Sequence, residues 1–156
     1  MAHNKGFSLD FKGFLDLAED IDEKYSTNYL QAVVEWALDE TRNYVNKEIE
    51  RALDNSKYNF EAGKGYSTGA ARASLEEVKN LPIEVEGTVV TAYAGFDLAK
   101  APETIMLAYG TPHLVKDKKL YNALKVKGSV KKAVDKKQKE IFVKGLDGNV
   151  PNKYLR

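Results

Sequence analysis

The sequence contains no cysteine. This absence excludes disulfide-stapled scaffolds, zinc sites with thiolate ligands, iron–sulfur clusters and cysteine nucleophiles. Histidine occurs only twice, as His3 and His113, and only His113 has a carboxylate, that of Asp117, at a spacing typical of a ligand pair. A zinc site needs three or four ligands. We therefore predict no metal site and no cofactor.

Long apolar runs are also lacking. No run approaches the roughly 18 apolar residues of a membrane-spanning helix. The segment Met1–Lys12 has no apolar core followed by a small-residue cleavage site, which is the pattern of a secretory signal. We therefore expect a protein that has no membrane partner and is made and used without secretion.

The composition is that of one ordinary globular domain. The chain has 156 residues, of which 43% are hydrophobic and 30% charged. This length suffices for one domain with a hydrophobic core but is short for two domains that each have their own core. We expect a single α+β domain over residues 1–146, and a tail over 147–156 whose glycine and proline make its order depend on external contacts.

Charge is distributed unevenly along the chain. From Asp10 to Glu61 there are 13 acidic and six basic residues, a net charge of −7, whereas from Lys116 to Lys144 there are 11 basic and three acidic residues, a net charge of +8. Such a distribution can pair within the chain, attract neighbouring copies head to tail, or present a basic strip to nucleic acid. A solvated lysine face without function is the fourth interpretation.

The first half of the sequence predicts a strand and two helices. Residues Phe7–Phe11 alternate apolar and polar side chains, as a half-buried strand does, and Gly13 interrupts the pattern. Helical spacing then predicts a short helix over Phe14–Tyr25 and a long amphipathic helix over Leu30–Leu53. At 1.5 Å per residue the long helix extends about 40 Å, so we expect part of it to reach a neighbouring subunit.

The second half predicts a loop, a sheet and a last helix. Lys57–Gly69 indicates a flexible loop, 70–78 a helical turn or a transition into sheet, and 83–93 a strand pair or one long bent strand. The apolar run 104–109 is too short to distinguish strand from helical turn. Ser129 begins a helix with Val130, Ala133, Val134 and Ile141 on one stripe. The expected fold is a long amphipathic helix, with shorter N- and C-terminal helices, packed on a small, mostly antiparallel sheet.

Two motifs that suggest catalysis fail in their context. Gly65–Gly69 reads G-x-S-x-G, and Asp97 and His113 follow in the order expected of an α/β-hydrolase. That motif requires a hydrophobic strand before the serine, but the preceding segment is polar and contains glycine. Residues 63–65 likewise lack the order of residues that forms a phosphate-binding loop. We predict no catalytic residue and no enzyme.

Three separated stretches resemble one known family. They are Thr68–Leu75 (TGAARASL), Tyr93–Phe96 with Leu107–Thr111 (YAGF and LAYGT), and Leu120–Leu124 (LYNAL). Taken in order, they are similar to segments of the head-tail joining or tail-completion (neck) proteins of long-tailed bacteriophages. The resemblance extends from about Phe7 to Leu146 and includes the order of the expected elements.

The resemblance implies a structural virion protein rather than an enzyme. It would form a homo-oligomeric ring, commonly of six copies, at the head-tail junction or the tail end, in head-tail joining, tail completion or tail termination. Its partners would be copies of itself, tail-tube and head-tail connector proteins, and DNA contacted non-specifically in the lumen. It would be made in the bacterial cytoplasm and located in the virion.

The candidate interface residues follow from this function and from the uneven charge. We expect an acidic long helix of one subunit to attract the basic last helix of the next across a heterologous ring contact. The candidate subunit or partner interface consists of Lys64, Tyr66, Arg72, Lys125, Lys127, Lys131, Lys132 and Lys136. The alternative function is a nucleic-acid-binding module without sequence preference, which uses the lysines of the last helix.

Overall fold

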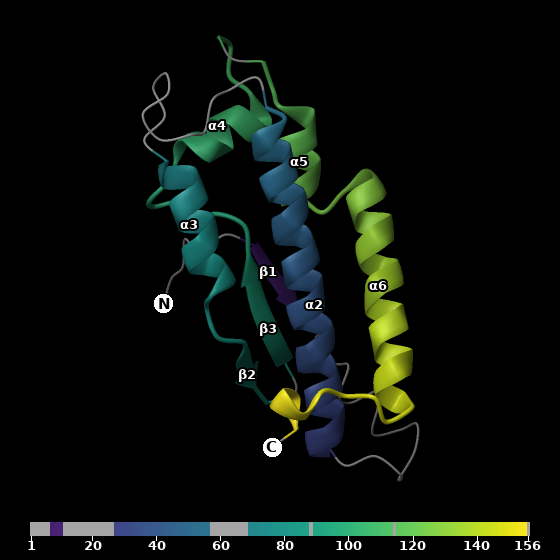
Figure 1. Ribbon diagram of the computed structural model, residues 1–156. Coiled ribbons are helices and arrows are strands. Elements are labelled where there is room, and N and C mark those ends of the chain that lie inside the picture. Colours follow the sequence, from purple (N-terminus) through teal and green to yellow (C-terminus); the bar gives the residue numbers. More distant parts are fainter. Residues whose placement is uncertain (1–6, 11–26, 57–68, 88, 114, 156) are drawn as a thin grey trace.

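The computed structural model describes residues 7–10, 27–56, 69–87, 89–113 and 115–155 (Figure 1). The predicted helix over Phe14–Tyr25 lies outside the described residues, as does most of the predicted loop. The helices and strands are β1 (Phe7–Asp10), α2 (Thr27–Asp54), α3 (Ala70–Lys79), β2 (Glu84–Glu86), β3 (Val89–Ala94), α4 (Glu103–Tyr109), α5 (Lys118–Leu124), α6 (Gly128–Leu146) and the 3-10 helix η1 (Asn152–Tyr154).

The sheet is small and antiparallel, with strand order β1-β3-β2. On the central strand β3, buried Val90, Ala92 and Ala94 alternate with half-buried residues, which is the two-residue period of a sheet with one face packed on a core. Gly87 has a φ of +61° between β2 and β3, a value that a residue without a side chain adopts at little cost. The segment predicted as either a strand pair or one bent strand is therefore a strand pair.

Helix α2 is the centre of the molecule. One side of the helix, with Leu30, Val34 and Leu38, packs on Val90 and Ala92 of the sheet. Other sides are covered by α6, by α5 and by the C-terminal segment, and side chains are buried from Leu30 to Leu53. The length that we expected to reach a neighbouring subunit is thus covered by the chain itself, because α2 is buried on several sides and not along one stripe only.

Helix α6 lies along α2 within the same chain (Figure 1). A Cβ atom added to Gly145 would lie 2.5 Å from Cγ1 of Val33, so the absent side chain permits the close approach of the two helices. Lys137 Nζ lies 3.8 Å from Glu40 Oε2 across the same contact. The acidic long helix and the basic last helix therefore contact each other within one chain, and the expected contact between these helices of neighbouring subunits stays a prediction.

The segment after α6 also returns to α2. Val150 and Tyr154 are buried in an apolar cluster with Ala32 and Val33. We expected this tail to depend on external contacts for its order, but the contacts that it makes here are with its own chain. Its position near the N-terminal end of α2 follows from the direction of α6, which runs antiparallel to α2 (Figure 1).

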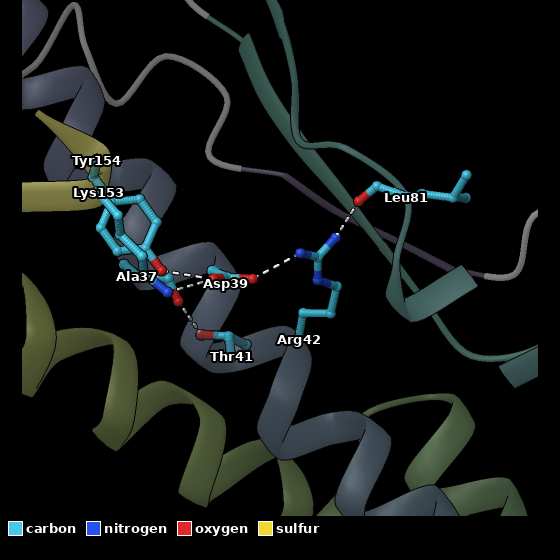
Figure 2. Close-up of polar contacts among 7 residues, drawn as sticks. All are labelled: Ala37, Asp39, Thr41, Arg42, Leu81, Lys153 and Tyr154. Carbon is cyan, nitrogen blue, oxygen red and sulfur yellow. Dashed lines mark hydrogen bonds and ion pairs between the residues drawn. The ribbon is translucent and has the colours of Figure 1, made fainter. Parts of the chain in front are cut away.

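A polar cluster fastens this tail to α2 (Figure 2). The Tyr154 hydroxyl donates to Asp39 Oδ2 at 2.6 Å, and Arg42 donates to Asp39 Oδ1 and to the Leu81 carbonyl, both at 2.7 Å. Lys153 Nζ lies 3.7 Å from Asp39 Oδ2. Burial by itself raises the pKa of Asp39, but the hydrogen bonds from Tyr154 and Arg42 and the two nearby cations outweigh it and lower this pKa. Burial and the Asp39 carboxylate raise the pKa of Tyr154.

The α+β fold class is confirmed, with the long helix on a small antiparallel sheet. The two segments left open, 70–78 and 104–109, belong to helices α3 and α4. Helix α5 was not predicted, because seven residues with charged flanks give too little periodicity to type. No helix in the described part of the chain is both long and apolar enough to cross a membrane.

Candidate functional site

The predicted interface residues fall into three groups. The first group is Lys64, Tyr66 and Arg72, of which Lys64 and Tyr66 lie outside the described residues. Arg72, in the first turn of α3, donates to Asp54 Oδ1 at 2.8 Å and so joins the start of α3 to the end of α2. This ion pair is half exposed, which makes it a modest stabilising contact between two helices.

The second group lies on the exposed face of α6. Lys131 pairs with Asp135 at 3.0 Å and Lys136 with Glu140 at 3.8 Å, each one helical turn apart, while Lys132 is exposed. Acidic residues thus offset part of the lysine charge along this helix. The strip that sequence reasoning described as basic is a mixed-charge face with an excess of lysine.

The third group, Lys125 and Lys127, lies on the turn between α5 and α6. The turn is held by backbone hydrogen bonds from Lys125 to the Tyr121 carbonyl and from Lys127 to the Asn122 carbonyl, both 2.9 Å. Val126 between them has a φ of +49°, which a β-branched residue rarely adopts and which costs of order 1 kcal/mol. The surrounding contacts therefore hold both lysines in a defined position on one end of the molecule.

Lys125 and Lys127, together with Lys116, lie around the rings of two tyrosines. The rings of Tyr109 on α4 and Tyr121 on α5 meet edge to face, with centroids 5.1 Å apart. Lys116 Nζ lies 3.5 Å from the centroid of Tyr121, Lys127 Nζ 5.4 Å from the same ring, and Lys125 Nζ 5.2 Å from the ring of Tyr109. Cation–π contacts of this kind contribute about 0.5–1 kcal/mol each at exposed sites. We call these five residues the lysine–tyrosine cluster.

An apolar pocket of about 270 Å³ adjoins this cluster. Its walls come from the segment after β3, from α4 and from the end of α5, and its lining residues are Phe96, Leu98, Thr104, Ile105, Tyr109, Leu124 and Lys125. Tyr109 and Lys125 belong to both features, so the pocket has an apolar interior and a cationic rim. This combination suits an apolar group with negative charge beside it.

Tertiary structure also brings the three stretches of the family resemblance together. All three contribute to one apolar cluster with the C-terminal half of α2. Its buried members are Val45, Ile49, Ala52, Leu53, Ala71, Leu75, Ala94, Phe96, Ala101, Ala108, Leu120, Ala123, Leu124, Val130 and Val134. The pocket and the lysine–tyrosine cluster lie on the surface of this unit.

The residues considered for metal binding have structural contacts. Asp117 caps α5 by accepting from the Leu120 amide at 3.0 Å, and its other oxygen accepts from the Ser56 hydroxyl at 2.7 Å. His113 is exposed, and its backbone amide donates to Thr111. Within the described ranges no three histidine or acidic side chains are close enough to hold a metal ion. Ser67 of the rejected hydrolase motif lies outside the described residues.

Sequence reasoning missed the pocket and three members of the lysine–tyrosine cluster, Lys116, Tyr109 and Tyr121. The available signal was the recurrence of lysines beside tyrosines between Tyr109 and Lys127, which we interpreted as family motifs and surface charge only. Phe96 gave no signal of its own, because a single aromatic residue after a strand is usually part of a core. Comparisons of the chain with family models, curated proteins and solved structures found no match.

Proposed function

We propose that this protein is a structural component of a long-tailed phage virion, forming a ring at the head-tail junction or the tail end. The observation that carries this proposal is the meeting of the three resembling stretches around the C-terminal half of α2. They are separated by as many as about 50 residues in the sequence, and the fold packs them into one unit. The α+β fold of the chain is the class that the resemblance implies.

Uneven surface charge gives further support. The end with the pocket carries Lys116, Lys125 and Lys127, whereas the edge strand β2 at the other end of the molecule carries Glu84 and Glu86 (Figure 1). The lysines of the pocket region and the carboxylates of β2 are oppositely charged surfaces of one subunit, and heterologous contacts bring different surfaces of successive copies together. Such contacts close into rings when the rotation between subunits permits.

The proposal is tested by electron microscopy of particles made when this gene is inactivated in its parent phage or prophage. Full heads separated from tails, or tails of abnormal length, are the expected products. The wild-type gene supplied in trans should restore normal particles, which controls for effects on neighbouring genes. Normal infectious virions without the gene would refute the proposal.

Nucleic-acid binding by α6 is the alternative function. Lysines near phosphates release counterions, so such binding weakens steeply as salt rises. The ion pairs of Lys131 with Asp135 and of Lys136 with Glu140 reduce the charge that α6 presents, which makes this alternative the weaker one. Tight duplex binding at low salt that falls steeply with salt would favour it, and no binding at low salt would eliminate it.

A further inference from the structure

The pocket beside the lysine–tyrosine cluster has room for one small molecule. Its volume is about 270 Å³. An engineered cavity of about 150 Å³ with walls of leucine, isoleucine and phenylalanine binds benzene, so a ring or a short alkyl chain fits here. The pocket is partly open to solvent, where Ile105 and Tyr109 are 43% and 47% exposed. A ligand can therefore enter it from solution.

The interior of the pocket selects an apolar group. Phe96 and Leu124 form buried walls, and Leu98 lies beside them. The buried hydroxyl of Thr104 donates to the Ala101 carbonyl at 2.8 Å, so its proton is already used within the chain. Burying a polar ligand group without a partner is costly, whereas an apolar group gains from leaving water.

The rim of the pocket is positively charged. Lys125 lines the pocket, and its Nζ lies 5.2 Å from the ring centroid of Tyr109, which lines it too. From Tyr109 to Lys127 the sequence has five lysines, all of them exposed, and one acidic residue, Asp117. The Asp117 carboxylate serves as the N-cap of α5. The rim therefore attracts an anion and repels a cation.

We propose that this pocket binds a small amphiphilic anion of the medium-chain fatty acid class. Its apolar chain lies between Phe96 and Leu124, and its carboxylate lies beside Lys125 at the rim. A neutral molecule of the same shape lacks the attraction at the rim, and an amine is repelled there. This binding site goes beyond the proposed virion function, and its test does not depend on that function.

Amide NMR titration of the full chain with octanoate at neutral pH tests the site. The signals of residues 96–98, 104–109 and 124–125 should shift, which locates the ligand. Each methylene added between hexanoate and octanoate should raise the affinity about fourfold, the factor expected when one methylene is buried. Octanol should bind about threefold more weakly than octanoate or worse, and octylammonium more weakly still. No shifts at these residues with about 10 mM octanoate, or octanol bound as tightly as octanoate, would overturn the proposal.

Two neighbouring residues of α4 provide a matched pair of variants. Ile105 lines the pocket and Met106 does not, although they are 43% and 48% exposed. Ile105→Glu should weaken octanoate binding about tenfold or more, because it places a carboxylate in the apolar wall. Met106→Glu should change the binding by no more than about twofold, because salt screens a charge that does not contact the ligand. Equal weakening by the two variants would place the ligand outside the pocket.

A second pair of variants tests the rim. Lys125→Gln should weaken octanoate binding about threefold or more and leave octanol binding unchanged, because octanol makes no ionic contact. Lys132→Gln is the control, since Lys132 is exposed on α6, and it should change neither. Octanoate bound equally well by Lys125→Gln and the wild type would show that the rim does not select the anion, and would refute the proposal.

Discussion

Gly145→Ala is the substitution whose effect the structure defines most closely. The new methyl group would lie 2.5 Å and 2.9 Å from the two γ-carbons of Val33, where real contacts are close to 4 Å. Helix α6 must therefore move away from α2, or Val33 must leave its rotamer. The Gly145 carbonyl also accepts a hydrogen bond from Tyr29, which that movement would disturb.

The magnitude follows from two opposing effects. Overpacking of a well-packed contact costs about 1–3 kcal/mol. Replacing a helical glycine by alanine contributes about 0.5–1 kcal/mol of stability, and less near the helix end where Gly145 lies. We expect a net loss of about 1–2 kcal/mol in the free energy of unfolding, or about 2–8 °C in Tm.

A double-mutant cycle with Val33→Ala identifies the cause. The smaller side chain at residue 33 makes room for the methyl group. The loss of unfolding free energy in the double variant should therefore be smaller than the summed losses of the two single variants, by about 1 kcal/mol or more. Urea unfolding provides the free energies. Lys144→Ala is the control, since Lys144 is exposed one residue away. Additive losses, or a Gly145→Ala protein as stable as the wild type, would refute the reasoning.

Three further predictions concern the tail, α5 and α6. Tyr154→Phe should cost about 1–2 kcal/mol of unfolding free energy near neutral pH, measured by thermal unfolding. Because folding lowers the pKa of Asp39 and raises that of Tyr154, the stability of the wild type should fall as pH drops below about 3.8 and as pH rises above about 10. The alkaline loss should be smaller in the variant, and equal alkaline losses in the two proteins would contradict the assignment. Asp117→Ala should cost about 1–2 kcal/mol in urea unfolding, and Asp117→Asn, which retains a capping oxygen, clearly less; similar losses would argue against the cap. Reversing charge at Lys131 and Lys132 together should leave Tm within about 2 °C but weaken subunit association or docking, and unchanged ring formation in the variant would exclude this surface from the interface.

Much of the fold could be predicted from local pattern. The long apolar repeat predicted α2 within a few residues of its ends, and the apolar stripe of Val130, Ala133, Val134 and Ile141 after Ser129 predicted α6. The β-branched residues before Tyr93 predicted strands, and Gly87 marked the place where they turn. Each of these features depends on neighbours in the sequence, which is why the pattern alone identified them.

The candidate site could be predicted only in part. Lys125 and Lys127 were identified as interface residues from charge alone, but their tyrosine partners lie on α4 and α5, which the sequence did not type as helices. A pocket between the segment after β3, α4 and α5 has no local pattern, since its walls are separated by as many as about 30 residues. Only their packing creates it.

The sequence by itself determined the α+β class, the main helices, the absence of cysteine chemistry and the uneven charge, because these depend on composition and on periods of two and 3.6 residues. Tertiary structure decided which charged and apolar surfaces meet. It paired α6 with α2 inside the chain through Gly145 and Val33, and it fastened Tyr154 to Asp39. It also left β2 and the pocket exposed toward opposite ends. Side-chain volume and long-range contacts control such choices, and no local pattern in one sequence records them.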